Sequence, residues 1–136
     1  MRRGFARDQR GLAAVEFALI VPVLASVLLF GFDGWMQLRQ AGDMQTALHS
    51  GVRYYQAGGT SDYDALVVGL NAWPHKPAGA TFSVARACVC GGAAGSCNTL
   101  CGTQPPNIQV TLSASSTYAG SMYSRAMTET QVVRVR

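Results

Sequence analysis

The chain begins with a change from polar to apolar positions that predicts a helix of membrane length. Residues 1–11 are polar and carry four arginines and one aspartate, and an apolar run follows over residues 12–32. A helix of that length extends roughly 30 Å, which matches the hydrocarbon core of a bilayer. One acid, Glu16, interrupts the run, although a carboxylate at the bilayer centre costs roughly 2.5–3.5 kcal/mol. An acid at this position therefore needs an explanation.

Beyond residue 32 the helical pattern continues, but only one apolar stripe remains. We expect a single long helix over residues 12–57, with Pro22 as a place where it can bend. Spacings of three and four between the stripe residues are typical of a helix with one buried face. The stripe consists of Ala41, Met44, Leu48, Val52 and Tyr55. The other faces are expected to carry Gln37, Arg39, Gln40, Asp43, Gln45 and Arg53.

A short second helix is predicted after Gly58 and Gly59, which end the first. Ser61 and Asp64 have the spacing of a capping box, in which each side chain binds the backbone N–H of the other residue. Apolar residues then recur at helical spacing until Pro74. They are Tyr63, Leu66, Val67, Leu70 and Trp73. The two aromatic residues in this set are expected in the core.

Three extended segments follow, each with the alternating apolar and polar positions of a half-buried strand. They cover residues 81–85, 108–114 and 131–136, whereas residues 118–128 are expected to form a loop or a short helix. The predicted fold is therefore α+β with a single transmembrane span. In it, a long N-terminal helix, transmembrane first and amphipathic later, packs on a small antiparallel sheet.

The formal net charge of +4 is concentrated in the leader, and this bears on orientation and partners. Because arginines precede the apolar run, the positive-inside rule places the N-terminus in the cytoplasm. We thus expect a basic cytoplasmic leader (1–11), a transmembrane helix (12–32) and an extracytoplasmic α+β domain (33–136). No basic run with interleaved aromatic residues occurs elsewhere, which argues against a nucleic-acid partner.

Four cysteines lie in the short loop 88–101: Cys88, Cys90, Cys97 and Cys101. Outside the cytoplasm, an even and closely spaced set favours two disulfides. Since Cys88 and Cys90 diverge on an extended strand, the open pairings are 88–97 with 90–101, or 88–101 with 90–97. A zinc site and free or redox-active thiols are the alternatives. However, the spacing lacks both the C-x2-C pairs of zinc knuckles and a C-x-x-C redox motif.

Motifs of catalysis are not found in the sequence. It contains no G-x-S-x-G, H-E-x-x-H, Walker or dinucleotide-binding pattern. Asp62 and Asp64 suit the start of a helix better than a catalytic pair, since acids there interact favourably with the helix dipole. We therefore expect no enzyme, and no catalytic residue, cofactor, metal or small-molecule substrate.

The junction between leader and apolar run resembles the processing site of type IV pilins. Cleavage after Gly11 would make Leu12 the first residue of the mature chain and Glu16 the fifth. The sequence GLAAVEFALIVPVL at residues 11–24 is more narrowly similar to the TadE-like proteins of the Tad/Flp pilus machinery. The similarity continues to the stretch 50–53, and the cysteine cluster before a Val- and Thr-rich strand is similar to many members.

This resemblance implies a pilin-like fold and a membrane-anchored minor subunit or assembly factor of a Tad (type IVb, Flp-like) pilus. The role would be structural, in adhesion or secretion-type machinery. The implied partners are other pilus subunits, inner-membrane pilus assembly proteins, the lipid bilayer and a prepilin peptidase that acts between Gly11 and Leu12. The location would be the bacterial inner membrane with a periplasmic C-terminal domain, or later an extracellular pilus.

The same resemblance gives Glu16 a role. In a helical bundle, its carboxylate can pair with the Leu12 amine of a neighbouring subunit. A buried charge without a partner is strongly unfavourable, so such a pair sets the axial register of the subunits.

Two other interpretations of the apolar run are open. Residues 23–25 have the small residue of a secretory cleavage site, although the apolar run continues past them. The run can also be an uncleaved anchor in which Glu16 extends toward the headgroups. The chain would then be a bitopic membrane protein whose small disulfide-stapled periplasmic domain binds a partner unrelated to pili.

Overall fold

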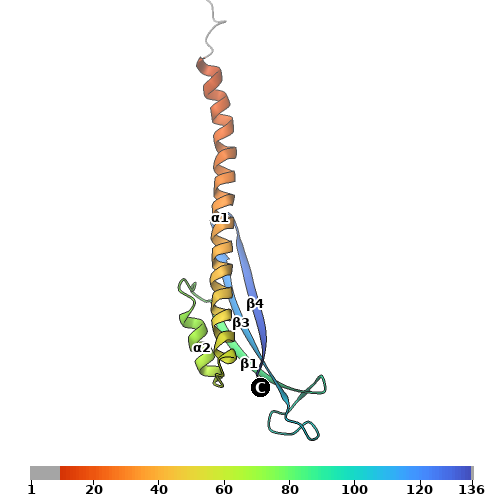
Figure 1. The fold of residues 1–136 in the computed structure, drawn as a ribbon. Helices are drawn as coiled ribbons and strands as arrows, with labels where there is room; N and C mark the ends of the chain where they lie inside the picture. The colour runs from red at the N-terminus through yellow and green to blue at the C-terminus, as the bar shows by residue number, and fades with distance from the viewer. Residues whose placement is uncertain (1–9, 136) are drawn as a thin grey trace, which may run out of the picture.

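The computed structural model describes residues 10–135, with side chains from residue 13 onward. It consists of one long helix with a small helix and a sheet packed along its second half, while the first half projects alone (Figure 1). The α+β fold with a small antiparallel sheet is confirmed. The elements are α1 (Arg10–Gln56), α2 (Asp62–Asn71), β1 (Thr81–Cys90), β2 (Ala93–Gly95), β3 (Asn107–Ala119) and β4 (Ser124–Val135).

The helix α1 is continuous from Arg10 to Gln56 and passes through Pro22 without a break. The hydroxyl of Ser26 donates a 2.8 Å hydrogen bond to the carbonyl of Pro22 one turn earlier. This bond satisfies the serine hydroxyl within the apolar half, and α1 continues without the one bond that Pro22, which lacks an N–H, cannot donate to the carbonyl of Ala18. One helix thus joins the projecting apolar half to the folded domain.

The sheet is entirely antiparallel, with strand order β2-β1-β3-β4. β3 lies between the two other long strands, and its alternate residues Val110, Leu112 and Ala114 are fully buried against the helices. The expected stripe on α1 meets this face, since Met44, Leu48 and Tyr55 all belong to the core. Trp73 and Phe82 complete the core from the segment after α2 and from β1.

The start of α2 forms only half of the expected capping box. The Ser61 hydroxyl accepts a 3.2 Å bond from the backbone N–H of Asp64. The reciprocal bond is absent, because the Ser61 N–H donates to the Tyr54 hydroxyl (3.4 Å), which in turn donates to the Asp64 carboxylate (3.3 Å). The prediction that Trp73 is buried is confirmed, whereas Tyr63 is 74% exposed and its expected place in the core is wrong.

The strands are longer than the sequence pattern predicts. Residues 118–128 were expected to form a loop or a short helix, but they complete β3 and begin β4 around the four-residue turn Gly120–Tyr123. The pairing runs without a bulge from Ile108 opposite Val135 to Ala119 opposite Ser124. β2 was not expected at all. Six of the twelve residues in the added segments 115–119 and 124–130 are Ser or Thr, so a pattern based on hydrophobicity does not reveal these ends of β3 and β4.

Gly69 allows α2 to approach β1 closely. A Cβ atom at this position would overlap the aromatic ring of Phe82, which is itself buried. In contrast, a Cβ atom at Gly42, on α1, would meet no atom within 4 Å.

We therefore expect Gly69→Ala to lower the free energy of unfolding by about 1–2 kcal/mol, because overpacking exceeds the gain in helix propensity. Gly42→Ala, the matched control, is expected to leave stability unchanged or raise it by up to about 1 kcal/mol. Thermal unfolding of the detergent-solubilised chain, followed by circular dichroism, measures both. Equal stability of the two variants would contradict the close packing.

Candidate assembly site

The first half of α1 has no partner within the described chain. All residues from 13 to 32 are exposed, including every large apolar side chain from Val15 to Phe32. An 18-residue window of the helix has a mean hydropathy of 2.4, and none of that window is buried. Among the described residues, α1 is therefore one helix that is long and apolar enough, by length and composition, to cross a membrane.

Glu16 lies exposed on this apolar surface. Gly11 and Leu12 belong to the first turns of α1, and Leu12 precedes Glu16 by four positions, which is about one helical turn. The remainder of the expected leader, residues 1–9, lies outside the described residues. The structure thus places the three sequence-predicted processing residues together at one end of the helix.

Asp33 lies at the C-terminal end of the apolar half of α1, and the sequence pattern did not reveal its role. Its side chain is only 1% exposed, although it directly follows the apolar run. The carboxylate accepts hydrogen bonds from the backbone N–H groups of Ser121 (3.1 Å) and Met122 (2.7 Å) and from the Tyr118 hydroxyl (3.3 Å). Asp33 therefore fastens the β3–β4 turn to the point where α1 enters the folded domain.

The hydrogen bond from the Met122 backbone lowers the pKa of Asp33 below its usual range, against the opposing effect of burial. The Ser121 and Tyr118 bonds act in the same direction. A carboxyl group with a lowered pKa in the folded state stabilises the fold at a pH above its unfolded pKa. That contribution is lost as the pH falls through the folded pKa.

Two glutamines continue the attachment along the same side of α1. The Tyr123 hydroxyl donates to Gln37 Oε1 (2.6 Å), and Gln40 Nε2 donates to the Ser116 hydroxyl (2.8 Å). Ser116 in turn donates to the sulfur of Met44 at 3.1 Å. The expectation that both glutamines lie on other faces is therefore wrong. The stripe that faces the sheet begins with polar residues and becomes apolar from Met44 onward.

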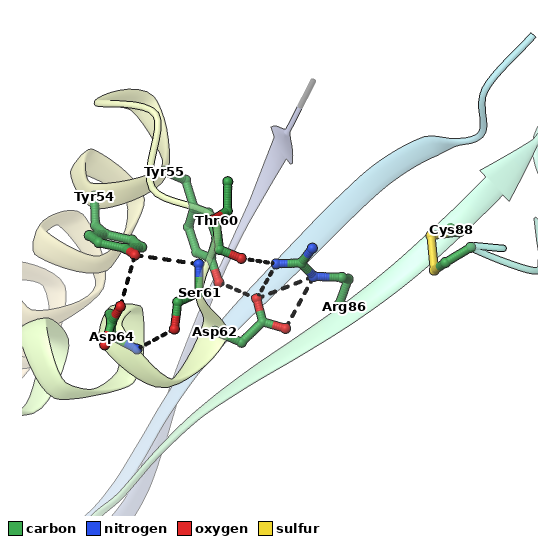
Figure 2. Close-up of polar contacts among 9 residues, drawn as sticks. Tyr54, Tyr55, Thr60, Ser61, Asp62, Asp64, Arg86 and Cys88 are labelled. Atoms are coloured by element: carbon green, nitrogen blue, oxygen red, sulfur yellow. Dashed lines mark hydrogen bonds and ion pairs between the residues drawn. A yellow bond between two sulfur atoms is a disulfide. The ribbon is translucent and has the colours of Figure 1, made fainter.

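At its other end, α1 is attached through an ion pair between α2 and β1 (Figure 2). Arg86 donates to both carboxylate oxygens of Asp62, at 2.6–3.2 Å, and to the carbonyl of Thr60 at 2.7 Å. The Tyr55 hydroxyl donates to the same carboxylate at 2.6 Å. This cluster joins the last turn of α1, the connection to α2 and strand β1.

The charges in this cluster affect one another. The hydrogen bond from Arg86 is the main reason that the pKa of Asp62 is lowered, and the same contact raises the pKa of Arg86. Burial, together with the bond to Asp62, raises the pKa of Tyr55 to about 12. At neutral pH, Asp62 and Arg86 are thus charged and Tyr55 is a neutral donor. Asp62 serves this ion pair, which is a structural role.

The cysteines form two disulfides, Cys88–Cys97 and Cys90–Cys101. This is one of the two pairings that the spacing left open, and it uses all four cysteines. The loop projects from the end of the sheet opposite the apolar half of α1 (Figure 1). Residues 91–100 are all exposed, so the disulfides rather than a core hold this loop. No cluster of metal-ligating side chains occurs among the described residues.

Replacing Asp33 tests the attachment of the turn. Asp33→Asn keeps the size of the side chain, but Ser121 and Met122 donate to different carboxylate oxygens, so one N–H would face an amide nitrogen. We expect hydrogen exchange at these two amides to accelerate roughly tenfold or more, and the variant to lose less stability than the wild type as the pH falls below about 4. Asp43→Asn is the control, because the Asp43 carboxylate contacts only the exposed imidazole of His75, at 3.4 Å, among the charged groups of the described residues. Unchanged exchange in Asp33→Asn would contradict this role.

Replacing Arg86 tests the second attachment. Arg86→Lys keeps the positive charge. However, a lysine cannot bind both carboxylate oxygens of Asp62 and the Thr60 carbonyl in the planar geometry of a guanidinium. We expect a loss of about 1 kcal/mol in the free energy of unfolding, since the pair is partly exposed. Arg53→Lys, on the exposed side of α1, is expected to have no effect in the same thermal unfolding experiment. A similar loss in both variants would show that the forked geometry is unimportant.

Comparison with known proteins bears on α1. No curated protein matches the chain, and no solved structure does. Residues 11–53 match the family model described as TadE-like protein. The match begins at the predicted processing junction and ends near the last turn of α1, so it includes Glu16 and Asp33 but not the sheet. It confirms the resemblance: α1 of this chain is a TadE-like segment.

Proposed function

We propose that this protein is a membrane-anchored minor pilin-like subunit or assembly factor of a Tad (type IVb, Flp-like) pilus. The observation that carries the proposal is the apolar half of α1: it lies within the TadE-like match, has no partner among the described residues and carries one carboxylate, that of Glu16. The TadE-like segment associates the chain with Tad pili. Residues 1–11 are a cytoplasmic leader, residues 12–32 span the inner membrane, and residues 33–136 form a periplasmic domain.

Processing by a prepilin peptidase completes the site. Cleavage after Gly11 creates an α-amino group at Leu12 that is cationic near neutral pH. Glu16 lies about one turn away on the same helix, inside an apolar surface. When helices of neighbouring subunits pack, the carboxylate of one chain pairs with the amine of the next. Because an unpaired charge in that surrounding is strongly unfavourable, only one axial register satisfies both groups.

This pairing gives Glu16 a testable role in assembly that is separate from insertion. Glu16→Gln keeps the shape of the side chain but removes the charge. We expect membrane insertion as in the wild type, measured by resistance to alkaline extraction, and a fall of roughly tenfold or more in the pilus subunits that co-purify with the tagged chain. Leu19→Ala, also exposed on the apolar half, is the control for a simple change of that surface.

Equal recovery of pilus subunits with the wild type and Glu16→Gln would overturn the register mechanism. Failure of the wild-type chain to co-purify with any pilus subunit would overturn the wider proposal and favour a bitopic protein with a different partner.

A further inference from the structure

The β3–β4 turn lies level with the exit of α1 from its apolar half. The turn Gly120–Tyr123 is closed by the backbone bond from Gly120 to Tyr123 (2.9 Å). Asp33, the first residue after the apolar run, holds the N–H groups of Ser121 and Met122. A Cβ atom at Gly120 would meet Asp33 Oδ2 at 2.7 Å, so glycine permits this close approach. The hairpin of β3 and β4 accordingly ends beside the middle of α1 (Figure 1).

Apolar and aromatic side chains are exposed at this level. Met122, at the tip of the turn, is 44% exposed, and Phe32 and Trp35 on α1 are each 56% exposed. Aromatic residues at the end of a membrane span are typical of the interface between hydrocarbon and headgroups. An apolar methionine at the tip of a turn is not stabilised by exposure to water. Beside a membrane span, the same side chain reaches the acyl chains that surround the span.

The charges around the turn fit a phosphate-rich layer. The Arg39 guanidinium lies 6.0 Å from the centroid of the Trp35 ring, and Arg125 is exposed on β4 two residues after the turn. Among the described residues, the acid hydrogen-bonded to the turn is Asp33, which is buried and bound by N–H donors. Cations next to an aromatic belt match the phosphates of phospholipid headgroups.

We propose that the β3–β4 turn is a second membrane contact, in which Met122 enters the boundary between headgroups and acyl chains beside the α1 span. The inference rests on the proposed transmembrane role of α1. A single span leaves a domain free to tilt and rotate, whereas a second contact fixes which side of the domain faces the bilayer. Asp33 is the positioning residue, because withdrawal of the turn would leave its carboxylate buried without its donors.

Single-tryptophan variants of the full chain test this contact in phospholipid vesicles with brominated acyl chains. Each variant carries both Trp35→Phe and Trp73→Phe, so that the introduced tryptophan is the only one. The second replacement breaks no hydrogen bond, because the indole N–H of Trp73 has no partner. Met122→Trp reports on the turn, Leu24→Trp on the span, and Leu100→Trp on the disulfide loop at the opposite end, where Leu100 is 65% exposed. Unbrominated vesicles give the reference emission of each variant.

We expect strong quenching of Leu24→Trp, and quenching of Met122→Trp that exceeds that of Leu100→Trp by about threefold or more. If Leu24→Trp is quenched while Met122→Trp resembles Leu100→Trp, the turn does not touch lipid and this inference is wrong, although the span remains. If Leu24→Trp is not quenched, the span itself is wrong, and the proposed function fails with it.

Discussion

One continuous helix has to satisfy two different surroundings, and the rest of the structure depends on this constraint. Between residues 13 and 32, α1 exposes apolar side chains apart from Glu16 and Ser26, whereas its second half contributes Met44, Leu48 and Tyr55 to the core of the domain. The hydrophobic effect alone would collapse a sheet onto either half. Asp33 marks the division, since its buried carboxylate takes the N–H groups of the turn and stops the sheet there.

The domain is organised around this division. Next to the apolar half of α1, the contacts between α1 and the sheet are directional hydrogen bonds, which Asp33 and Gln37 accept and Gln40 donates. Farther away they are apolar, and the Arg86–Asp62 pair secures the far end. Directional bonds fix the position of the hairpin along α1 more strictly than apolar contacts do. The apolar half is thus presented at a fixed place relative to the domain, which is what a subunit assembled through that half requires.

The sequence predicts the parts of the fold that have a strong period. The long helix, the Ser61 cap and the central alternation of β3 all follow from spacing. The far end of β3 does not, because Ser116 and Tyr118 are buried with little difference in hydrophobicity from their neighbours. Asp33 was missed because two of its three donors are backbone N–H groups 88 and 89 positions away, and backbone groups leave no mark in a sequence. A stripe traced backwards from Met44 through Gln40 and Gln37 would have reached Asp33.

The central claim is that the unpartnered half of α1 is a pilin-type segment with its new N-terminus at Leu12. Intact mass and N-terminal sequencing of the chain from its host's membranes, with and without the prepilin peptidase, test this most directly. The account predicts a chain that begins at Leu12 only when the peptidase is present. A chain that keeps Met1 to Gly11 in both cases would contradict it and leave Glu16 without a role.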